Sequence, residues 1–307
     1  MQPTPIEQQG FTAQELGEKD IPPLRLIIQN LIPEGLTILA GKSKIGKSWF
    51  ALDICLAKAT GTDALGQGAA PQGTVLLLAL EDSARRLQDR IATRKRGFPP
   101  SLKIYLEWKR LNTGGLSDLS RILEQTRYDL VVIDTFAKVK DMERPKTQEL
   151  YIFDYEQNAK IKALADKHST AIVLIHHLRK MFAADEVDSL NGSTGIAAGA
   201  DTIMIMTRAR GEVADATLLV TGRDIEERRL ALRHGPDGWK ILGEAAECGE
   251  SGTRQDILAL LRHHPEGLRP VDIATTAEIS PANVRQTLKR LSDDGVVKKR
   301  GGLYFAS

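Results

Sequence analysis

A segment rich in glycine and lysine, Gly41-Lys-Ser-Lys-Ile-Gly-Lys-Ser48, is the part of the sequence best suited to chemistry. It matches the pattern G-x-x-x-x-G-K-[ST] and lies between an apolar run at 36–40 and a helical pattern at 48–60. Glycines let backbone N–H groups approach phosphate oxygens, and the N-terminus of the following helix adds positive partial charge. The segment predicts a nucleoside triphosphate site with these binding residues: Gly41, Lys42, Ser43, Lys44, Ile45, Gly46, Lys47, Ser48 and Trp49.

Two side chains of this loop have specific expected roles. We expect the ammonium group of Lys47 to reach the β- and γ-phosphates. We expect the hydroxyl of Ser48 to bind Mg²⁺. The motif therefore predicts ATP and Mg²⁺ as the bound species.

Carboxylates follow two other apolar runs. Asp134 ends the run 130–133, and we expect it to hold Mg²⁺ through water from the strand beside the phosphate loop. Glu81 follows the run 74–80 and is the candidate for orienting the attacking water, because Thr135 and not a glutamate follows Asp134. Asp82 is expected to cap the helix that begins near residue 83. The alternatives are that Asp134 caps the next turn and that Glu81 is a solvated loop charge.

Two histidines and a long polar segment follow the next strand. His176 and His177 close the run 170–175, where a polar side chain can contact the γ-phosphate and report its loss. Either histidine is equally compatible with a core or surface position. Residues 181–195 form a long polar loop that either touches DNA or only connects its neighbours.

The arrangement of apolar runs predicts an α/β fold. Near-continuous Val, Ile and Leu runs alternate with helical stretches at 48–60, 83–96 and 149–167, which indicates a mostly parallel sheet with helices on both faces. The runs 201–206, 216–221 and 229–232 follow with few helix signals and suggest an antiparallel edge. In such sheets ligands bind beyond the carboxyl ends of the strands, where the residues above are found.

Together these features resemble the RecA-like superfamily, and within it the RepA-type hexameric plasmid helicases and related phage and mobile-element ATPases. The resemblance covers residues 21–235 and rests on the segments 33–40, 79–82, 129–135, 175–177 and 192–197. It implies a homo-oligomeric ring, most simply a hexamer, that passes single-stranded DNA and has ATP sites between subunits. It also implies an arginine supplied by the neighbouring subunit, for which Arg208, Arg210 and Arg223 are candidates. The sequence shows no separate N-terminal primase-binding domain of the DnaB sort.

Residues 253–307 form a second unit that resembles a winged helix-turn-helix. Helical patterns at 255–263, at 270–276 and from Ser280-Pro281 onward precede two short strands around Gly301-Gly302. The candidate DNA-binding residues are Asn283, Arg285, Gln286, Lys289, Lys298, Lys299 and Arg300. The alternative is a winged helix used for protein contact or ring assembly.

The remaining features set the limits of this interpretation. We divide the chain into a polar segment 1–20, a RecA-like ATPase domain 21–242, a linker 243–252 and the winged helix. The 42 basic and 40 acidic side chains give a net charge of +2, which neither requires nor excludes nucleic acid. Two cysteines offer no disulfide framework, and no run is apolar enough to span a bilayer. We therefore expect a cytoplasmic protein without membrane contact.

Two functions fit these features. The first is a ring ATPase acting on DNA, as a replicative helicase or replication protein of a plasmid, phage or mobile element. The second is an ATP-switched DNA-binding regulator or replication initiator that does not translocate. A small-molecule kinase fits poorly, since nothing in the sequence forms a lid or a second substrate pocket.

Overall fold

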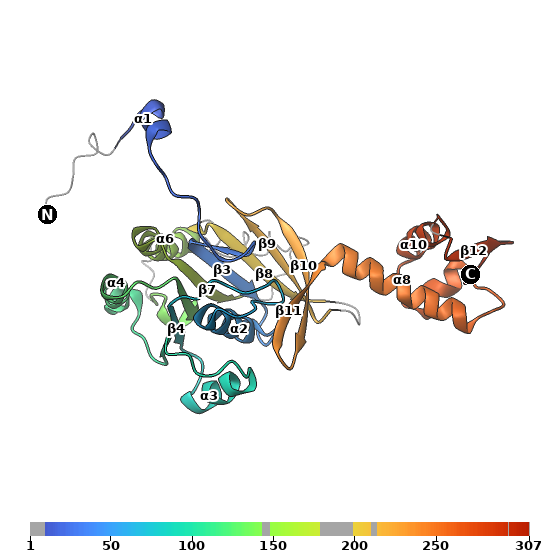
Figure 1. Cartoon of the computed structure of the whole chain (residues 1–307), viewed down its shortest axis with the longest axis horizontal. Helices are drawn as coiled ribbons and strands as arrows, with labels where there is room; N and C mark the ends of the chain where they lie inside the picture. Colours follow the sequence, from blue (N-terminus) through green and yellow to red (C-terminus); the bar gives the residue numbers. More distant parts are fainter. Residues whose placement is uncertain (1–9, 143–147, 179–198, 210–213, 294, 307) are drawn as a thin grey trace.

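A nine-stranded sheet organises most of the molecule in the computed structural model, which describes residues 10–142, 148–178, 199–209, 214–293 and 295–306. The strands lie in the order β11-β10-β9-β8-β3-β7-β6-β4-β5 (Figure 1). Their bounds are β3 Gly35–Gly41, β4 Val75–Ala79, β5 Leu102–Tyr105, β6 Leu130–Asp134, β7 Ala171–His177, β8 Thr202–Arg208, β9 Ala216–Gly222, β10 Arg228–Gly235 and β11 Gly238–Glu244. The predicted α/β class is confirmed.

The sheet changes from parallel to antiparallel pairing near one edge. Strands β5, β4, β6, β7, β3 and β8 pair in parallel, and β9, β10 and β11 continue the sheet as an antiparallel ribbon. The sequence predicted that the antiparallel edge begins at 201–206. That prediction was wrong by one strand, because β8 pairs in parallel with β3, with Met206 opposite Gly41. The antiparallel part begins with β9.

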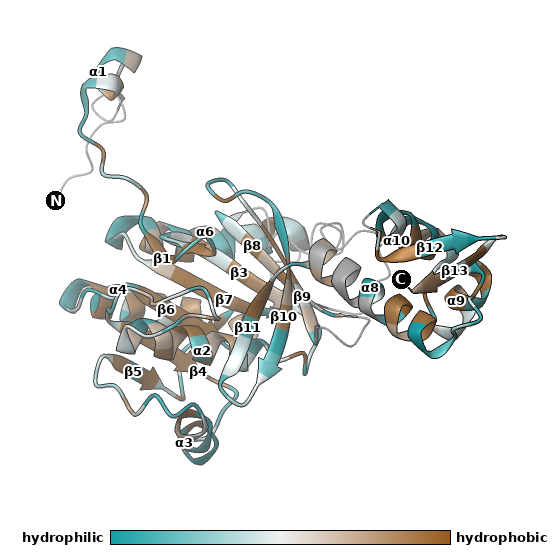
Figure 2. Cartoon of the chain, turned by 45° about the vertical axis from the view of Figure 1, so that its right-hand side comes forward, coloured by the Kyte–Doolittle hydropathy of each residue, from teal (hydrophilic) through white to brown (hydrophobic). Residues whose placement is uncertain are grey.

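Helices cover both faces of the sheet, and each face has its own apolar core. On one face, α2 (Lys47–Thr60) and α3 (Ala84–Thr93) pack through residues such as Phe50, Leu56 and Leu87. On the other, α4 (Gly115–Gln125), α5 (Phe136–Val139) and α6 (Leu150–His168) pack through residues such as Leu119 and Ile161. Figure 2 shows apolar strands between helices whose outer surfaces are polar. Burial on both faces explains why the central strands are continuous apolar runs.

The N-terminal part adds small elements outside the sheet. Helix α1 (Ala13–Glu18) is capped by Thr12 and has no buried residue, and Figure 1 shows it standing away from the sheet. Strands β1 (Leu26–Ile28) and β2 (Ile32–Pro33) then form a short antiparallel pair that covers one end of the first core. Across the described ranges, no helix combines the length and apolar character that crossing a bilayer requires.

The C-terminal module has a core of its own. Helices α8 (Ala245–His263), α9 (Pro270–Thr276) and α10 (Pro281–Asp293) precede the hairpin β12 (Val297–Arg300) and β13 (Leu303–Ala306). Leu268 adds a bridge to Tyr304 beside the hairpin. The buried residues of this core are Ile257, Leu261, Ile273, Ala274, Val284, Leu288, Leu291 and Val297. The predicted winged helix-turn-helix is confirmed.

The expected linker is not irregular. Only residues 243 and 244, at the end of β11, precede α8, and the helix runs through residues 245–252. The two glycines in this stretch, Gly249 and Gly252, disfavour helix as isolated residues, but the helix is continuous with the apolar face that begins at Ile257. A helix therefore connects the sheet to the C-terminal module (Figure 1).

Candidate nucleotide site and DNA-binding surface

The loop between β3 and α2 has a backbone that requires glycine at two points. Gly46 precedes the first residue of α2 at φ +105°, a conformation that side chains rarely adopt. At Gly41 a Cβ atom would lie 2.6 Å from the carbonyl oxygen of Met206 in the neighbouring strand. The first N–H groups of α2 have no partner within the helix, so they are available to an anion in front of the loop.

Lys47 is held against this loop. Its side chain is buried, and Nζ donates hydrogen bonds to the carbonyl oxygens of Gly41 at 2.8 Å and Lys42 at 2.9 Å. Burial lowers the pKa of Lys47 to about 8, against the opposing effect of the Asp134 and Glu81 carboxylates. The loop thus carries a desolvated cation that an anionic ligand would stabilise.

Strand β7, and not the strand of Asp134, lies beside the phosphate loop. The sequence predicted Asp134 on the strand next to β3, and this was wrong, because β7 separates β3 from β6. Strand order is decided by the crossover connections, which the motif spacing does not reveal. The consequence is that the end of β7, at His177, lies between the loop and the carboxylates.

His177 connects the loop to Glu81. Its Nδ1 lies 3.1 Å from Nζ of Lys47 and 3.5 Å from Oγ of Ser43. Its Nε2 lies 3.6 Å from Oε2 of Glu81. With Lys47 charged, Nδ1 accepts and Nε2 carries the proton that faces the glutamate. His176 pairs in register with Ala40 and points to the other face of the sheet, so the structure brings only His177 to the site.

Asp134 is a buried carboxylate beside Ser48. It is 7% exposed, it accepts a hydrogen bond from Ser48, and its Oδ1 has no hydrogen-bond partner. Burial raises the pKa of Asp134, partly offset by the Ser48 hydrogen bond, and Glu81 and Asp82 raise it further. Among the described residues no three His, Cys, Asp or Glu side chains form a metal site by themselves. A buried carboxylate oxygen without a partner, next to a serine hydroxyl, fits a cation such as Mg²⁺, which takes oxygen ligands and keeps several waters.

Glu81 and Asp82 have different surroundings. Glu81 keeps 44% of its side chain exposed, at the edge where a water molecule has access. Asp82 pairs instead with Arg86 and Arg90 of α3. The expected helix cap at Asp82 was wrong, since the side chain of Ser83 accepts from the Arg86 backbone N–H and caps α3.

Arg208 and Arg223, two of the three arginine candidates, lie at opposite ends of the paired strands β8 and β9. Arg208 is the last residue of β8, two positions beyond the pair of Met206 with Gly41, and its side chain is exposed at the edge of the phosphate loop. Arg223 follows β9, whose Gly222 pairs with Thr202 at the start of β8. Arg223 therefore lies at the end of the strands that is remote from the phosphate loop. Arg210 and the loop 181–195 lie outside the described residues.

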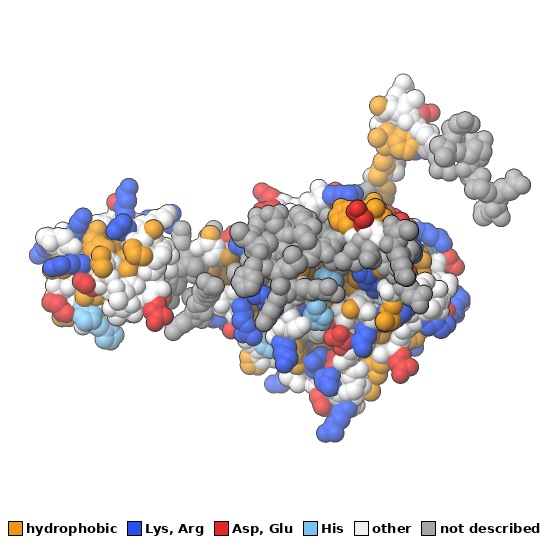
Figure 3. Space-filling view, turned by 180° about the vertical axis from the view of Figure 1, so that it is seen from behind, with side chains coloured by type: hydrophobic (Ala, Val, Ile, Leu, Met, Phe, Trp, Pro, Cys, Tyr) orange, Lys and Arg blue, Asp and Glu red, His pale blue; other side chains and the backbone are white. Residues whose placement is uncertain are grey.

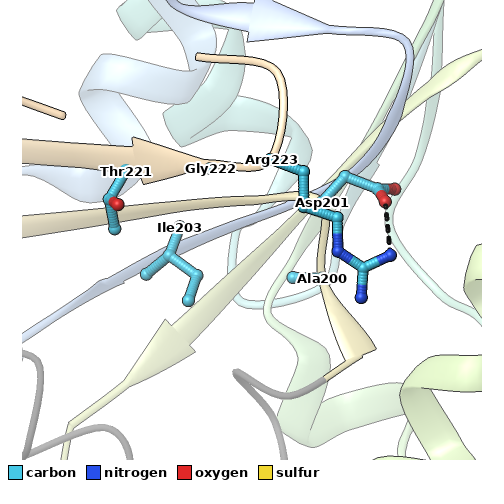
Figure 4. Close-up of a pocket in the computed structure, with 6 residues that line it drawn as sticks. All are labelled: Ala200, Asp201, Ile203, Thr221, Gly222 and Arg223. Carbon is cyan, nitrogen blue, oxygen red and sulfur yellow. Dashed lines mark ion pairs between the residues drawn. The ribbon is translucent and has the colours of Figure 1, made fainter. Parts of the chain in front are cut away.

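A hollow lies where β8 begins and β9 ends. It is an open depression of about 190 Å³ and is lined by Ala200, Asp201, Ile203, Thr221, Gly222 and Arg223. Figure 4 shows the Arg223 guanidinium directed at Asp201, 3.9 Å away. The Asp201 carboxylate also accepts from Lys162 and from the backbone N–H of Leu36. The polar groups of the hollow therefore pair with one another. The hollow lies at the start of β8, and the phosphate loop lies at the opposite end of the paired strand β3, so the two are separate.

Two tryptophans lie at the first turn of α2: Trp49 belongs to that turn, and Trp239 packs against its start. The ring of Trp49 packs under Arg94, whose Cζ is 4.2 Å from the ring centroid. Trp239 of β11 donates from Nε1 to the carbonyl oxygen of Gly46 at 3.3 Å. The motif predicted a role for Trp49, but Trp239 was missed because β11 was not predicted. The signal was the segment Trp239-Lys-Ile-Leu242, in which three of four residues are apolar, directly after the turn Pro236-Asp237-Gly238.

The candidate DNA-binding residues form a surface on the C-terminal module. One face of α10 packs into the core of this module through Val284, Leu288 and Leu291. The predicted residues on α10 and on the hairpin are all exposed: Asn283, Arg285, Gln286, Lys289, Lys298, Lys299 and Arg300. Figure 3 shows most Lys and Arg side chains of this module in its upper part and the acidic side chains in its lower part. A positive surface of this kind suits a polyanion.

Comparison with known proteins follows the same division of the chain. The family model described as an AAA domain matches residues 2–182, more than half of the chain. The chain belongs to the AAA-domain family. The residues matched by the family model include the phosphate loop, Glu81, Asp134 and His177. A second model, described as a helix-turn-helix domain, matches residues 250–300. An ATPase domain is therefore joined to a helix-turn-helix domain, a combination that supports an ATPase acting on DNA.

Solved structures and curated proteins provide two further comparisons for this AAA-domain protein. One solved structure, described by its title as an ATPase domain, is similar over 68% of this chain and 85% of that chain, with 12% sequence identity and a TM-score of 0.49. The comparison with curated proteins gave no match.

Proposed function

We propose that this protein is an ATP-hydrolysing ring ATPase that acts on DNA, as a helicase or replication protein of a plasmid, phage or mobile element. One observation carries the proposal. Lys47, His177, Glu81 and Asp134, from four separate segments of the chain, meet at the carboxyl edge of one parallel sheet. The ATPase unit would comprise residues 21–242 and the DNA-binding unit residues 253–307.

In this proposal the phosphate loop binds the triphosphate of ATP. Backbone N–H groups of residues 42–49 surround the phosphates, and Lys47 exchanges its bonds to loop carbonyls for the β- and γ-phosphate oxygens. Ser48 and Asp134 would be the residues that hold Mg²⁺, with Asp134 acting through water. The ion, when bound, neutralises charge that develops between the β- and γ-phosphates.

Hydrolysis is assigned to Glu81. A water oxygen attacks the γ-phosphorus, the bond to the β-γ bridging oxygen breaks, and the water proton passes to the Glu81 carboxylate. The products are ADP and phosphate. His177 lies between Glu81 and Lys47 and so contacts both the base and the group that binds the γ-phosphate. We assign His177 the role of reporting phosphate loss to the rest of β7.

The neighbouring subunit would complete the site. Arg208 is the described candidate at the edge of the phosphate loop, and it is exposed. A guanidinium ion at the transferred phosphate accelerates hydrolysis by about 10³- to 10⁵-fold in enzymes that use one. Arg208→Ala is thus expected to reduce hydrolysis in the assembled ring and leave assembly intact.

Assays of hydrolysis, strand separation and mass test the ring-motor proposal. ATP hydrolysis of the full chain is measured with and without single-stranded DNA, strand separation is followed on a forked duplex, and native mass is recorded with ATP and DNA. The proposal expects DNA-stimulated hydrolysis, unwinding and a closed hexamer. Ring-sized assemblies that neither respond to DNA nor unwind it would refute the motor.

A second function is favoured by the exposed basic surface on α10 and the hairpin. In that case ATP switches a regulator or initiator that recognises one DNA site and does not translocate. Footprinting on duplex DNA, with ATP and with the Lys47→Ala variant, separates the two functions. Site-specific protection without unwinding supports the regulator, and protection that is independent of sequence supports the motor.

A further inference from the structure

We propose that Trp239 is a positioning residue for the phosphate loop, which it holds in the conformation that aims α2 at the bound phosphates. The inference rests on the proposed ATPase function. It adds a residue from an edge strand of the sheet to the proposed nucleotide site. Trp239 lies on β11, the outermost antiparallel strand, and is almost 200 residues away from the loop in sequence.

The indole of Trp239 lies directly on Gly46. A Cβ atom on Gly46 would be only 2.6 Å from Cζ2 of the indole, so ring and backbone are in close contact. Nε1 donates to the Gly46 carbonyl at 3.3 Å, and the same carbonyl accepts the first hydrogen bond of α2, from Phe50. One tryptophan therefore contacts the peptide that ends the loop and begins the helix. Gly46 has many accessible conformations as a free residue, and this contact restricts them.

A buried ion pair holds Trp239 in turn. Its backbone N–H donates to Oδ2 of Asp53 at 2.9 Å, and Asp53 accepts from the guanidinium of Arg94. Asp53 and Arg94 each have 2% of their side chain exposed. Separating the two buried charges would be strongly destabilising, so the pair fixes the Asp53 carboxylate on α2. The hydrogen bond from the Trp239 backbone then ties the start of β11 to this fixed group.

Gly238 shows how tight this arrangement is. It lies at φ +112°, and a Cβ atom there would be 2.6 Å from Oδ2 of Asp53. An alanine at 238 therefore displaces the start of β11 without changing the indole. This gives two independent ways to disturb the contact, one through the ring and one through the backbone.

Trp239 has no part in proton transfer or in metal binding, and its effect is expected on ATP binding before turnover. We expect Trp239→Leu to raise KM for ATP about tenfold, because the loop must be ordered by the ligand instead of by the protein. The value of kcat should fall less than threefold, since the bound phosphates then hold the loop in the same conformation. Gly238→Ala should give the same division between KM and kcat.

The matched control is Trp108→Phe. Trp108 donates to the Gly115 carbonyl at 3.1 Å and packs on Tyr105 over the opposite face of the sheet. Its replacement removes a half-buried indole of equal size and should leave KM for ATP unchanged. Thermal unfolding of all variants shows whether an altered KM accompanies general destabilisation.

A spectroscopic signal separates positioning from a purely structural role. The sequence has three tryptophans, so the Trp49→Phe, Trp108→Phe background keeps Trp239 as the single indole. We expect Mg-ADP to change the emission of this single tryptophan, because it lies on the loop that the phosphates would order. Gly238→Ala in the same background should reduce that change.

The outcomes distinguish the two levels of the proposal. If the unaltered chain neither binds nor hydrolyses ATP, the proposed function is wrong. If it hydrolyses ATP while KM in Trp239→Leu and Gly238→Ala stays within twofold and the single tryptophan does not respond to Mg-ADP, the role of Trp239 is overturned. A rise in KM for both variants, with a response of the single tryptophan, supports it.

Discussion

The phosphate-loop site and the C-terminal surface present polar groups in opposite ways. At the loop, Lys47 and Asp134 are buried, and their partners arrive from strands far apart in sequence. On the C-terminal module the seven candidate residues are exposed and come from one helix and one hairpin. Chemistry on phosphate needs convergent, desolvated groups, whereas contact with a polyanion needs only accessible charge. The two regions should therefore respond to different changes.

The two regions also have separate cores. None of the residues in the core beneath α10 belongs to the clusters that flank the sheet. A destabilising substitution in one region is thus expected to leave the other region folded.

The largest expected effect is on turnover, in Glu81→Gln. If Glu81 is the general base as proposed, its loss should lower kcat for ATP hydrolysis by about 10³-fold, within the usual contribution of a positioned acid or base. ATP binding and DNA binding should persist, because the amide has the same shape and the C-terminal surface is not involved. Steady-state hydrolysis and equilibrium binding give the two quantities.

The control is Glu107→Gln, which changes an exposed glutamate away from the loop. A Glu81→Gln variant that hydrolyses ATP within threefold of the unaltered rate would assign the base to another residue.

The next effect is on stability, in Leu288→Ala. Leu288 is fully buried in the core of the C-terminal module, so truncation should cost about 3 kcal/mol of unfolding free energy in that module. Denaturant unfolding should then show an earlier transition for the module and an unchanged one for the sheet. DNA binding should weaken, while basal hydrolysis remains.

Val271→Ala is the matched control, because Val271 lies on α9 with 60% exposure. A single transition that shifts as a whole in Leu288→Ala would show that the two regions unfold together.

A smaller effect is expected on DNA affinity when Lys298, Lys299 and Arg300 are replaced together by alanine. Three exposed charge contacts at about 1 kcal/mol each correspond to roughly a hundredfold loss of affinity. The slope of log affinity against log salt should fall by about 0.9 for every phosphate that the variant no longer neutralises. Binding titrations at several salt concentrations measure both.

Arg85→Ala with Lys103→Ala removes exposed charge from the ATPase part and serves as the comparison. Equal loss of binding free energy per charge removed, three charges in one set and two in the other, would mean that binding follows net charge and not the C-terminal surface.

The smallest effect is on the pH dependence of ATP binding. The folded chain has a Lys47 pKa of about 8, below the ordinary value of 10.5, so the charge is lost as pH rises through about 8. ATP favours the charged form, and its dissociation constant should therefore rise above that pH by a factor approaching tenfold per pH unit. Calorimetry between pH 7 and 9.5 measures the slope. Lys47→Arg keeps its charge and should flatten it.

The same shift predicts the direction of a stability change. Unfolded Lys47 binds its proton up to about pH 10.5 and folded Lys47 only up to about 8, so the buried charge lowers stability below pH 8. That cost should disappear as pH rises from 8 toward 10.5. Lys47→Met without nucleotide should be more stable than the unaltered chain at pH 7 and lose this advantage near pH 10.

The sequence predicted the parts of the fold that depend on local pattern. Continuous apolar runs give β3, β4, β6 and β7 because these strands are covered on both faces. The loop Gly41–Ser48 was found because its chemistry needs particular residues at fixed spacing. The helix α3 was predicted to reach residue 96 but ends at Thr93, where Arg94 turns inward to Asp53 and Lys95 takes a positive φ.

The rest depends on contacts between distant segments. The position of β7 between β3 and β6 follows from the crossover connections. The contact between His177 and Lys47 could therefore not be predicted from the segments that contain these two residues. Strand β11 mixes polar and apolar residues after a Gly-Pro-Asp-Gly turn, and its contact with the loop is visible only in the structure, where Trp239 lies on Gly46. The choice between Arg208 and Arg223 likewise required the antiparallel register of β9.

Binding of ATP at the loop 41–48 can be measured by calorimetric titration of the full chain, with and without Mg²⁺ and in parallel on Lys47→Ala. The account predicts one site per chain, tighter binding when Mg²⁺ is present, and at least a hundredfold loss (roughly 3 kcal/mol) when the buried ammonium group is removed. Equal affinity in the two proteins, or an unaltered chain that takes up no ATP, would contradict it.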